Sequence, residues 1–435
     1  MQNRKARRIA SSSRFLRRSC VVPAFFLHLF CVFSALPAQR LLIPMDLTQT
    51  DHLKAYGISY HALQKGINVE WLLNYRAGSF LMNPDDAIAK ECRAKGVLYE
   101  DVSPAQEVEI RKTIEGSNIA AVVLEKAPKV GVYMPPNREP WDDAVRIALD
   151  YAEIPYDRLW DPEVLQGKLR EYDWLHLHHE DFTGQYGKFF ANYQNTDWYR
   201  ADVTLNEKTA HELGFGKVSK LKLAVVKAIK QYVEGGGMVF GMCSAGDTPD
   251  IALAAENTDI CSPAFDGDGI DPDYQRKLNY DDCLAFENFS LVTDPMVYEH
   301  SDIDVYQEAT ARGRDAYFQL FDFSAKYDQV PCMLVQDHVS LVKEFLGQNC
   351  GFRRDKLKKG TLALAEVANT EEVKYVHGNV GKGTFTFLGG HDPEDFEHRI
   401  GDPPTNLELH RNSPGYRLIL NNVLFPAAQK KPLKT

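Results

Sequence analysis

The sequence predicts an α/β protein built on a doubly wound, mostly parallel sheet. Two observations carry this prediction: strand-like and helix-like segments alternate along two stretches of the chain, and the helix-like segments are long enough to cross over a sheet. The 435 residues are 44% hydrophobic and 25% charged, which is typical of a globular protein with a full core. Alternation of this kind favours right-handed β-α-β units.

The first stretch of alternating strands and helices follows the N-terminal segment. We assign its residues, 39–127, to an N-terminal α/β domain. Short apolar runs predict its strands, and amphipathic runs predict its helices. The expected strands are residues 41–45, 69–73 and 97–100, and the expected helices are residues 48–65, 85–95 and 104–115. Because each pair of strands is separated by a helix, we expect these strands to be parallel.

We assign the second stretch of alternating strands and helices, residues 128–428, to a larger domain. The expected strands are residues 129–134, 173–179, 238–242, 361–367, 373–377 and 383–388, and the expected helices are residues 141–152, 217–234 and 413–424. Residues 256–360 interrupt the series, because they are less periodic and rich in acidic and aromatic residues. We expect this segment to be a large insertion over the sheet.

Residues 1–38 have the composition of a secretory signal peptide. Seven basic residues and no acidic one accompany an apolar run at residues 21–36, and the small residues Ala35 and Ala38 follow in a cleavage-site pattern. The run is short for a membrane helix, and an uncleaved membrane anchor is the alternative interpretation. We therefore expect export to the periplasm or the outside of the cell, with no stable membrane span after cleavage.

Cleavage would leave a strongly acidic chain with six cysteines. Removing seven basic residues takes the formal net charge from −10 to −17, which argues against nucleic acid as a partner because such binding depends on neutralising phosphates. The expected partner is a small-molecule substrate or ligand, and no oligomeric state is predicted. An oxidising compartment permits disulfides, and the pairs that would close short loops are Cys261 with Cys283 and Cys332 with Cys350.

Cys243 is the first candidate for chemistry. It follows the glycine-rich strand at residues 238–242, and the carboxyl ends of parallel strands are where α/β proteins bind ligands. A thiol on the turn after such a strand can be a nucleophile facing backbone N–H groups. The alternative interpretation is that Cys243 is a small buried residue, which is common for free cysteine.

His391 and Glu394 are the expected partners of that thiol. His391 follows the strand at residues 383–388, so its imidazole is a candidate base, and Glu394 or Asp392 is the carboxylate that would fix its tautomer. Asp392 also suits the N-cap of a helix beginning at Pro393.

A run of polar residues from His176 to Asp181 forms a second candidate site. His176 and His178 alternate on one strand face, while His179 and Glu180 fall at the strand end. The two alternating histidines would chelate a metal if His391 or Asp181 supplied a third ligand. Because spacing identifies no third ligand, we predict no metal and no cofactor, and we assign His178, His179 and Glu180 to ligand binding.

Two further loops carry polar residues. Asp46 lies in a loop that leads into a helix N-terminus, a place that suits a polar ligand, and it is included among the binding residues. The acidic loop at residues 266–273 resembles a Ca²⁺ loop only in composition, so we interpret it as a solvated loop.

The segment from Gly235 to Ala245 resembles the nucleophile turn of the class I glutamine amidotransferase-like superfamily, and His391 with Glu394 resembles its His-x-Glu pair. The resemblance implies a flavodoxin-like sheet over about residues 128–425, with Cys243 as nucleophile, His391 as base and Glu394 as orienting acid. Relatives that keep the fold without the catalytic residues imply a non-catalytic ligand- or carbohydrate-binding domain as the alternative.

The whole chain after the N-terminal segment is also similar to exported bacterial proteins labelled asparagine synthetase B, on residues 43–57 and 71–80. It lacks the N-terminal cysteine and the Ser-Gly-Gly-x-Asp-Ser loop that such an enzyme requires, so we do not expect that activity. The function predicted from the sequence is a cysteine-dependent hydrolase or amidase acting on a small amide or ester. The other alternative is a metal-dependent hydrolase using His176 and His178.

Overall fold

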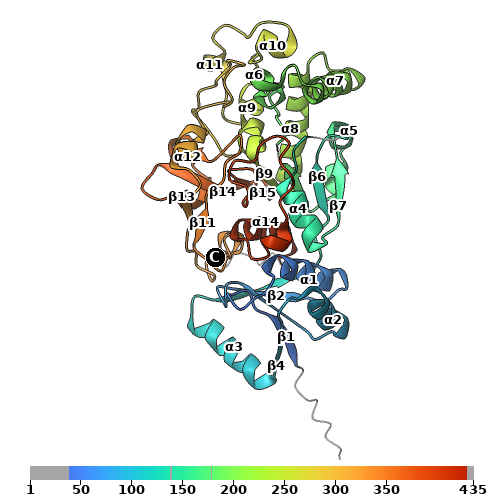
Figure 1. The fold of residues 1–435 in the computed structure, drawn as a ribbon, viewed down its shortest axis with the longest axis vertical. Coiled ribbons are helices and arrows are strands. Elements are labelled where there is room, and N and C mark those ends of the chain that lie inside the picture. Colours follow the sequence, from blue (N-terminus) through green and yellow to red (C-terminus); the bar gives the residue numbers. More distant parts are fainter. Residues whose placement is uncertain (1–38, 138–139, 178, 429–435) are drawn as a thin grey trace, which may run out of the picture. The chain divides into compact units, whose positions relative to one another are not determined.

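A computed structural model describes residues 39–137, 140–177 and 179–428. The described residues belong to one compact unit that contains two sheets (Figure 1). The predicted signal peptide lies outside the described residues. Among the residues that are described, no helix combines the length and the apolar character needed to cross a membrane.

The first sheet has five strands, and all its neighbouring strands are antiparallel. Its order is β4 (Glu100–Val102), β1 (Arg40–Ile43), β3 (Ser79–Met82), β2 (Val69–Leu73) and β5 (Ala120–Leu124). The prediction of parallel strands here is wrong. The reason is the tight turn after β2, in which Asn74, Ala77 and Gly78 have φ angles of 62°, 62° and 87°. This left-handed turn reverses the chain at once into β3, a strand that the sequence pattern did not reveal.

The second sheet has ten strands and joins a parallel half to an antiparallel half. Its order is β11 (Leu341–Lys343), β10 (Tyr317–Leu320), β13 (Leu362–Val367), β14 (Glu372–Val380), β15 (Gly383–Leu388), β9 (Met238–Met242), β8 (Trp174–Leu177), β6 (Val130–Tyr133) and β7 (Tyr156–Leu159), with β12 (Phe352–Arg353) beside β14. The pairs from β15 to β7 are parallel. All the others are antiparallel.

The predicted doubly wound, mostly parallel, flavodoxin-like sheet is therefore wrong. Short hairpins cause the difference: β13, β14 and β15 are joined by turns in which Asn369 and Gly381 have φ angles of 63° and 59°, and such turns can only join antiparallel strands. The segment predicted as an insertion over the sheet also contributes β10, β11 and β12 to the sheet itself.

Helices cover both sheets. They are α1 (His52–Gln64), α2 (Asp86–Lys95), α3 (Pro104–Gly116), α4 (Ala144–Ala152), α5 (Asp161–Leu165), α6 (Phe190–Tyr193), α7 (Asp197–Glu212), α8 (Val218–Glu234), α9 (Thr248–Ala254), α10 (Pro263–Asp266), α11 (Tyr274–Lys277), α12 (Tyr306–Arg312), α13 (Gln329–Leu334) and α14 (Pro414–Leu424). Helix α1 packs against α4 and α14. One hydrophobic core includes Trp71 of β2, Phe240 of β9 and Leu418 of α14, so it is shared by the two sheets.

The parallel half of the second sheet positions the candidate site. Leu388 at the end of β15 pairs with Met242 at the end of β9, and Leu177 at the end of β8 pairs with Gly241 and with Tyr133. The loops that follow these four strands therefore leave the same edge of the sheet side by side.

Candidate functional site

Cys243 begins a single 3₁₀ turn directly after β9. Its φ of 54° is left-handed, a costly conformation for a residue with a side chain, and such strain is typical of functional turns. Its backbone N–H donates to the carbonyl of Gly390 over 3.1 Å, so the loops after β9 and β15 are in contact. The thiol is 5% exposed, and its Sγ accepts the N–H of Gln348 over 3.2 Å.

The surroundings of Cys243 favour the neutral thiol. Burial raises its pKa to about 11, against the opposing effect of the Gln348 and Ser244 N–H groups. Asp304, which is also buried, adds to the rise. A thiol of this kind is a poor nucleophile near neutral pH, because the thiolate is the reactive form.

His391 lies in the loop after β15. Gly390 makes its placement possible: its φ is 102°, and a Cβ there would lie 2.3 Å from the ring of Phe345. The Nε2 of His391 is 3.1 Å from the main-chain carbonyl of Asp142, and its Nδ1 is 3.4 Å from the Nδ1 of His179. Asp142 and His179 therefore orient this imidazole.

Glu394 faces a different partner from the one expected. Its Oε2 is 2.9 Å from the Nδ1 of His410, and both residues line a neighbouring cleft of about 720 Å³. Asp392 accepts the hydroxyl of Tyr416 and the N–H of Glu394 in a turn, so the helix expected at this point is absent from the described loop. The Cys243–His391–Glu394 triad stays a prediction.

His176 in β8 and Asp181 in the loop after it are both buried, and both have polar partners within the fold. His176 is fully buried, with Nε2 3.3 Å from the Oδ1 of Asp143. Asp181 is buried and accepts the N–H groups of Thr183, Gln185 and Gly187. That bonding serves the loop, so Asp181 has a structural role.

His179 lies at the site. It faces His391 and packs edge-on to the indole of Trp141, with the ring centres 5.6 Å apart. The carbonyl of Glu180 accepts the hydroxyl of Thr248. His178 lies outside the described residues. Asp46 pairs with Arg76 over 2.6 Å at the end of the first sheet, and its role in binding stays a prediction.

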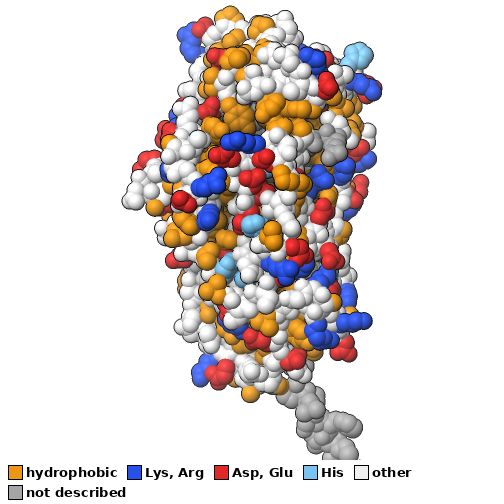
Figure 2. All heavy atoms as spheres, viewed as in Figure 1, with side chains coloured by type: hydrophobic (Ala, Val, Ile, Leu, Met, Phe, Trp, Pro, Cys, Tyr) orange, Lys and Arg blue, Asp and Glu red, His pale blue; other side chains and the backbone are white. Residues whose placement is uncertain are grey.

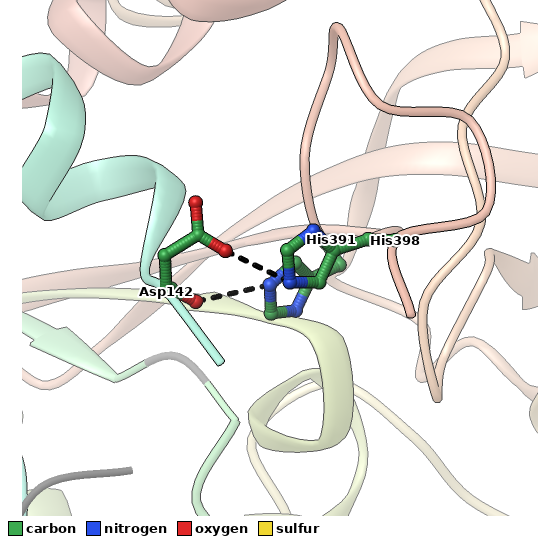
Figure 3. A group of neighbouring side chains, drawn as sticks. All are labelled: Asp142, His391 and His398. Atoms are coloured by element: carbon green, nitrogen blue, oxygen red, sulfur yellow. Dashed lines mark hydrogen bonds and ion pairs between the residues drawn. The ribbon is translucent and has the colours of Figure 1, made fainter. Parts of the chain in front are cut away.

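Asp142, His391 and His398 form a group that the sequence did not reveal (Figure 3). One potential ligand atom from each residue lies within 4.8 Å of the other two. The Oδ1 of Asp142 is 2.8 Å from the Nε2 of His398, and the rings of His391 and His398 stack with centres 4.1 Å apart. Burial lowers the pKa of His398, but the Asp142 carboxylate outweighs this effect and raises it.

The second nitrogen of each imidazole in this group is also held. The Nδ1 of His398 is 3.2 Å from the Oδ2 of Asp395, and the Nδ1 of His391 faces His179. Histidines that bind metals characteristically have their other ring nitrogen fixed by a carboxylate or another polar group. Two imidazoles and one carboxylate are also a common donor set for Zn²⁺ in catalytic sites.

A second group of potential ligands, formed by Asp259, Cys261 and Asp266, is already occupied by an ammonium group. The Nζ of Lys217 lies 2.6 Å from Asp259 and 3.0 Å from Asp266. The acidic loop at residues 266–273 is thus partly neutralised by this lysine instead of being wholly solvated.

Asp142 also lines a cleft of about 870 Å³ beside the carboxyl end of β6. The walls include Trp141 and Trp198, whose rings meet edge to face, and the arginines Arg146 and Arg158. Its size is that of a small-molecule site. On the face shown in Figure 2, acidic and basic side chains are interspersed.

The six cysteines of the described residues are all free and buried. The expected pairs Cys261–Cys283 and Cys332–Cys350 are therefore wrong. Each thiol has its own environment: Cys261 donates to the carbonyl of Thr183 and Cys283 to that of Asp250.

Comparison with known proteins identifies no family. No family model matches the chain, and no curated protein matches it either. Together with the mostly antiparallel strands, this leaves the expected class I amidotransferase-like fold without support.

Three solved structures show a weak likeness. Cytoplasmic Protein STM3548 from Salmonella typhimurium has 14% identity and a TM-score of 0.35, and the match covers 69% of this chain and 100% of that one. Cytoplasmic Protein STM1381 from Salmonella typhimurium LT2 has 10% identity and a TM-score of 0.35 over the same shares. Gan42B, a GH42 beta-galactosidase, has 7% identity and a TM-score of 0.24, with 61% of this chain and 28% of that one covered.

The two Salmonella proteins are described as cytoplasmic. The expectation of export depends on residues 1–38, which lie outside the described residues.

Proposed function

We propose that this protein is a metal-dependent hydrolase whose ion is held by Asp142, His391 and His398. The observation that carries the proposal is the convergence of these three donor groups within 4.8 Å beside a cleft large enough for a small substrate. Ligands of zinc lie about 2.0 to 2.2 Å from the ion, so donors around one ion are separated by no more than about 4.4 Å. A small adjustment of the side chains brings the group into that range.

The surrounding residues support this function. Asp395 accepts from His398, and His179 contacts His391, so the Nδ1 of each imidazole is held in place. Both Nε2 atoms now contact Asp142, and each would exchange that contact for the ion. Asp142 would bind the ion from the wall of the cleft. Such an ion supplies Lewis-acid catalysis and lowers the pKa of a bound water.

The alternative role of Cys243 as nucleophile is less well supported. Its thiol is buried, its pKa is raised to about 11, and it is absent from the described residues that line the cleft. The acid predicted to orient His391 pairs with His410. We therefore place the chemistry at the histidine–aspartate group, with substrates that carry a hydrolysable ester or amide bond.

Metal analysis tests the proposal directly. The purified chain is stripped with a chelator, reloaded with Zn²⁺ or Co²⁺, and assayed for bound metal, for the visible absorption of Co²⁺ and for hydrolysis of chromogenic esters and amides. We expect about one ion per chain. His391→Ala and His398→Ala should abolish tight binding, and Asp395→Asn should weaken it about 10- to 100-fold by releasing His398.

His211→Ala is the matched control, because His211 is an exposed histidine near the end of α7. It should bind metal as the wild type does. Failure of the reloaded chain to retain any ion, or equal retention by the His398→Ala variant, would remove the proposal. Selective retention of iron with oxygen-dependent turnover would replace hydrolysis with an oxidative reaction.

A further inference from the structure

Two arginines in the cleft beside Asp142 have no ion-pair partner among the described residues, in contrast to Arg76 and Arg111. Arg76 lies 2.6 Å from the Asp46 carboxylate, and Arg111 pairs with Glu70. Arg146 and Arg158 both line the cleft. Within the described residues, neither has a carboxylate oxygen within the 4.0 Å of an ion pair.

Each guanidinium is held in place by one neutral contact and keeps its other donors available. The Nε of Arg146 is 3.4 Å from the hydroxyl of Tyr156, so both of its terminal amino groups remain. The Nη2 of Arg158 donates to the carbonyl of Pro135 over 3.0 Å. A planar fork that is anchored at one edge is suited to bind a carboxylate or phosphate with the other.

The elements that carry these arginines place them around the same strand end. Arg146 is in the first turn of α4, where the helix dipole adds a positive potential. Arg158 is on β7 and pairs in register with Val132 of β6. Asp143, the acid nearest to Arg146 in sequence, already caps α4 through the N–H groups of Val145 and Arg146 and also faces His176.

We infer that the substrate is an anion, and that Arg146 and Arg158 bind its carboxylate or phosphate group so that its reactive bond faces Asp142, His391 and His398. This inference rests on the proposed function for the position of the reaction, but anion binding itself requires only the arginines. Asp142, Asp143, Asp150 and Asp402 also line the cleft, so the arginines would bind the anion through directed hydrogen bonds and not through a net positive charge of the cleft.

Chemical modification of arginine tests the inference without any assay of activity. Folded, metal-stripped protein is treated with phenylglyoxal in the presence of inorganic phosphate, of acetate or of neither, and modification of each arginine is measured by peptide mass spectrometry. We expect Arg146 and Arg158 to react without an anion and to be protected about tenfold by the anion that the site prefers. Protection by phosphate alone indicates a phosphate ester, and protection by acetate indicates a carboxylate.

Arg200 is the control, because it is exposed, lies outside the cleft lining and contacts only the neutral Asn195. Its modification should be unaffected by either anion. Equal modification of Arg146 and Arg158 with and without both anions overturns the inference, and so does protection that extends equally to Arg200.

The variants R146Q and R158Q keep the test independent of the metal. Calorimetric titration with inorganic phosphate or acetate should show about a tenfold loss of affinity in each. If protection is observed but no ion is retained, the proposed hydrolase fails while the anion site stands. If an ion is retained but protection is absent, only the anionic substrate is excluded.

Discussion

Alkylation of the folded protein over a range of pH tests whether Cys243 can act as a nucleophile. The thiolate is the reactive form, and burial raises the pKa of Cys243 to about 11. At pH 8 a thiol with that pKa is ionised in about one molecule in a thousand, whereas a free cysteine with a pKa of about 8.5 is ionised in about one in four. We therefore expect Cys243 to react about 200-fold more slowly than a free cysteine at this pH.

The assay is reaction with iodoacetamide followed by mass spectrometry of the Cys243 peptide. The rate should rise about tenfold for each unit of pH between pH 7 and pH 10, because the thiolate fraction rises in proportion. The same peptide in urea-unfolded protein gives the rate of a free thiol. Cys92, whose pKa burial raises to about 12, should react more slowly still in the folded state.

A different pH profile would refute this reasoning. If alkylation of Cys243 is already fast at pH 7 and stops rising above it, the thiolate is stabilised in the folded protein. The burial argument would then be wrong, and a cysteine-dependent hydrolase would become the better interpretation of the loops after β9 and β15. Circular dichroism at each pH confirms that the protein is still folded during the reaction.

Two further predictions concern stability. His377 is buried, and burial lowers its pKa to about 4. Between about pH 4 and 6.5 the unfolded state therefore binds more protons at this residue than the folded state does. The free energy of unfolding should consequently fall by about 2 kcal/mol from pH 7 to pH 5. Urea denaturation should show that His377→Gln reduces this loss and that exposed His211→Gln does not. Gly57 lies against α4, where a Cβ would be 1.9 Å from the carbonyl oxygen of Ala152. Gly57→Ala should lower the free energy of unfolding by about 1 to 3 kcal/mol, whereas Gly116→Ala, whose Cβ meets no atom within 4 Å, should not lower it; equal urea midpoints for the two variants would contradict the close packing of α1 on α4.

Local patterns were sufficient to place many elements but not to pair them. The strand expected at residues 69–73 and the strand expected at 383–388 have the observed bounds of β2 and β15. The direction of pairing depends on the turn or crossover after each strand. The turn after β2 places Arg76 and Ala77 in left-handed conformations, which these residue types do not signal. The sequence pattern therefore predicts a crossover where the chain forms an antiparallel hairpin of β2 and β3.

The part of the candidate site that lies at strand ends could be predicted from the sequence. His179 and His391 were expected at the ends of two strands, and those strand ends lie on one edge of the sheet, so the two imidazoles meet. Asp142 and His398 carry no comparable signal, because neither directly follows a strand. Their place depends on the path of the loop after β15.

The path of the loop after β15 also explains why the spacing of His391 and His398 matches no known metal-binding motif. His391 and His398 are separated by a loop, not by one turn of a helix or one step of a strand, so the regular spacings of known metal motifs do not apply to them. Gly390, with its φ of 102°, directs the loop away from β15, and His398, with a φ of 26°, turns it back until the two rings stack 4.1 Å apart. A donor set assembled by two left-handed residues is visible only after the backbone is built. For this reason the metal content of the His398→Ala variant tests the proposed function more directly than any motif in the sequence.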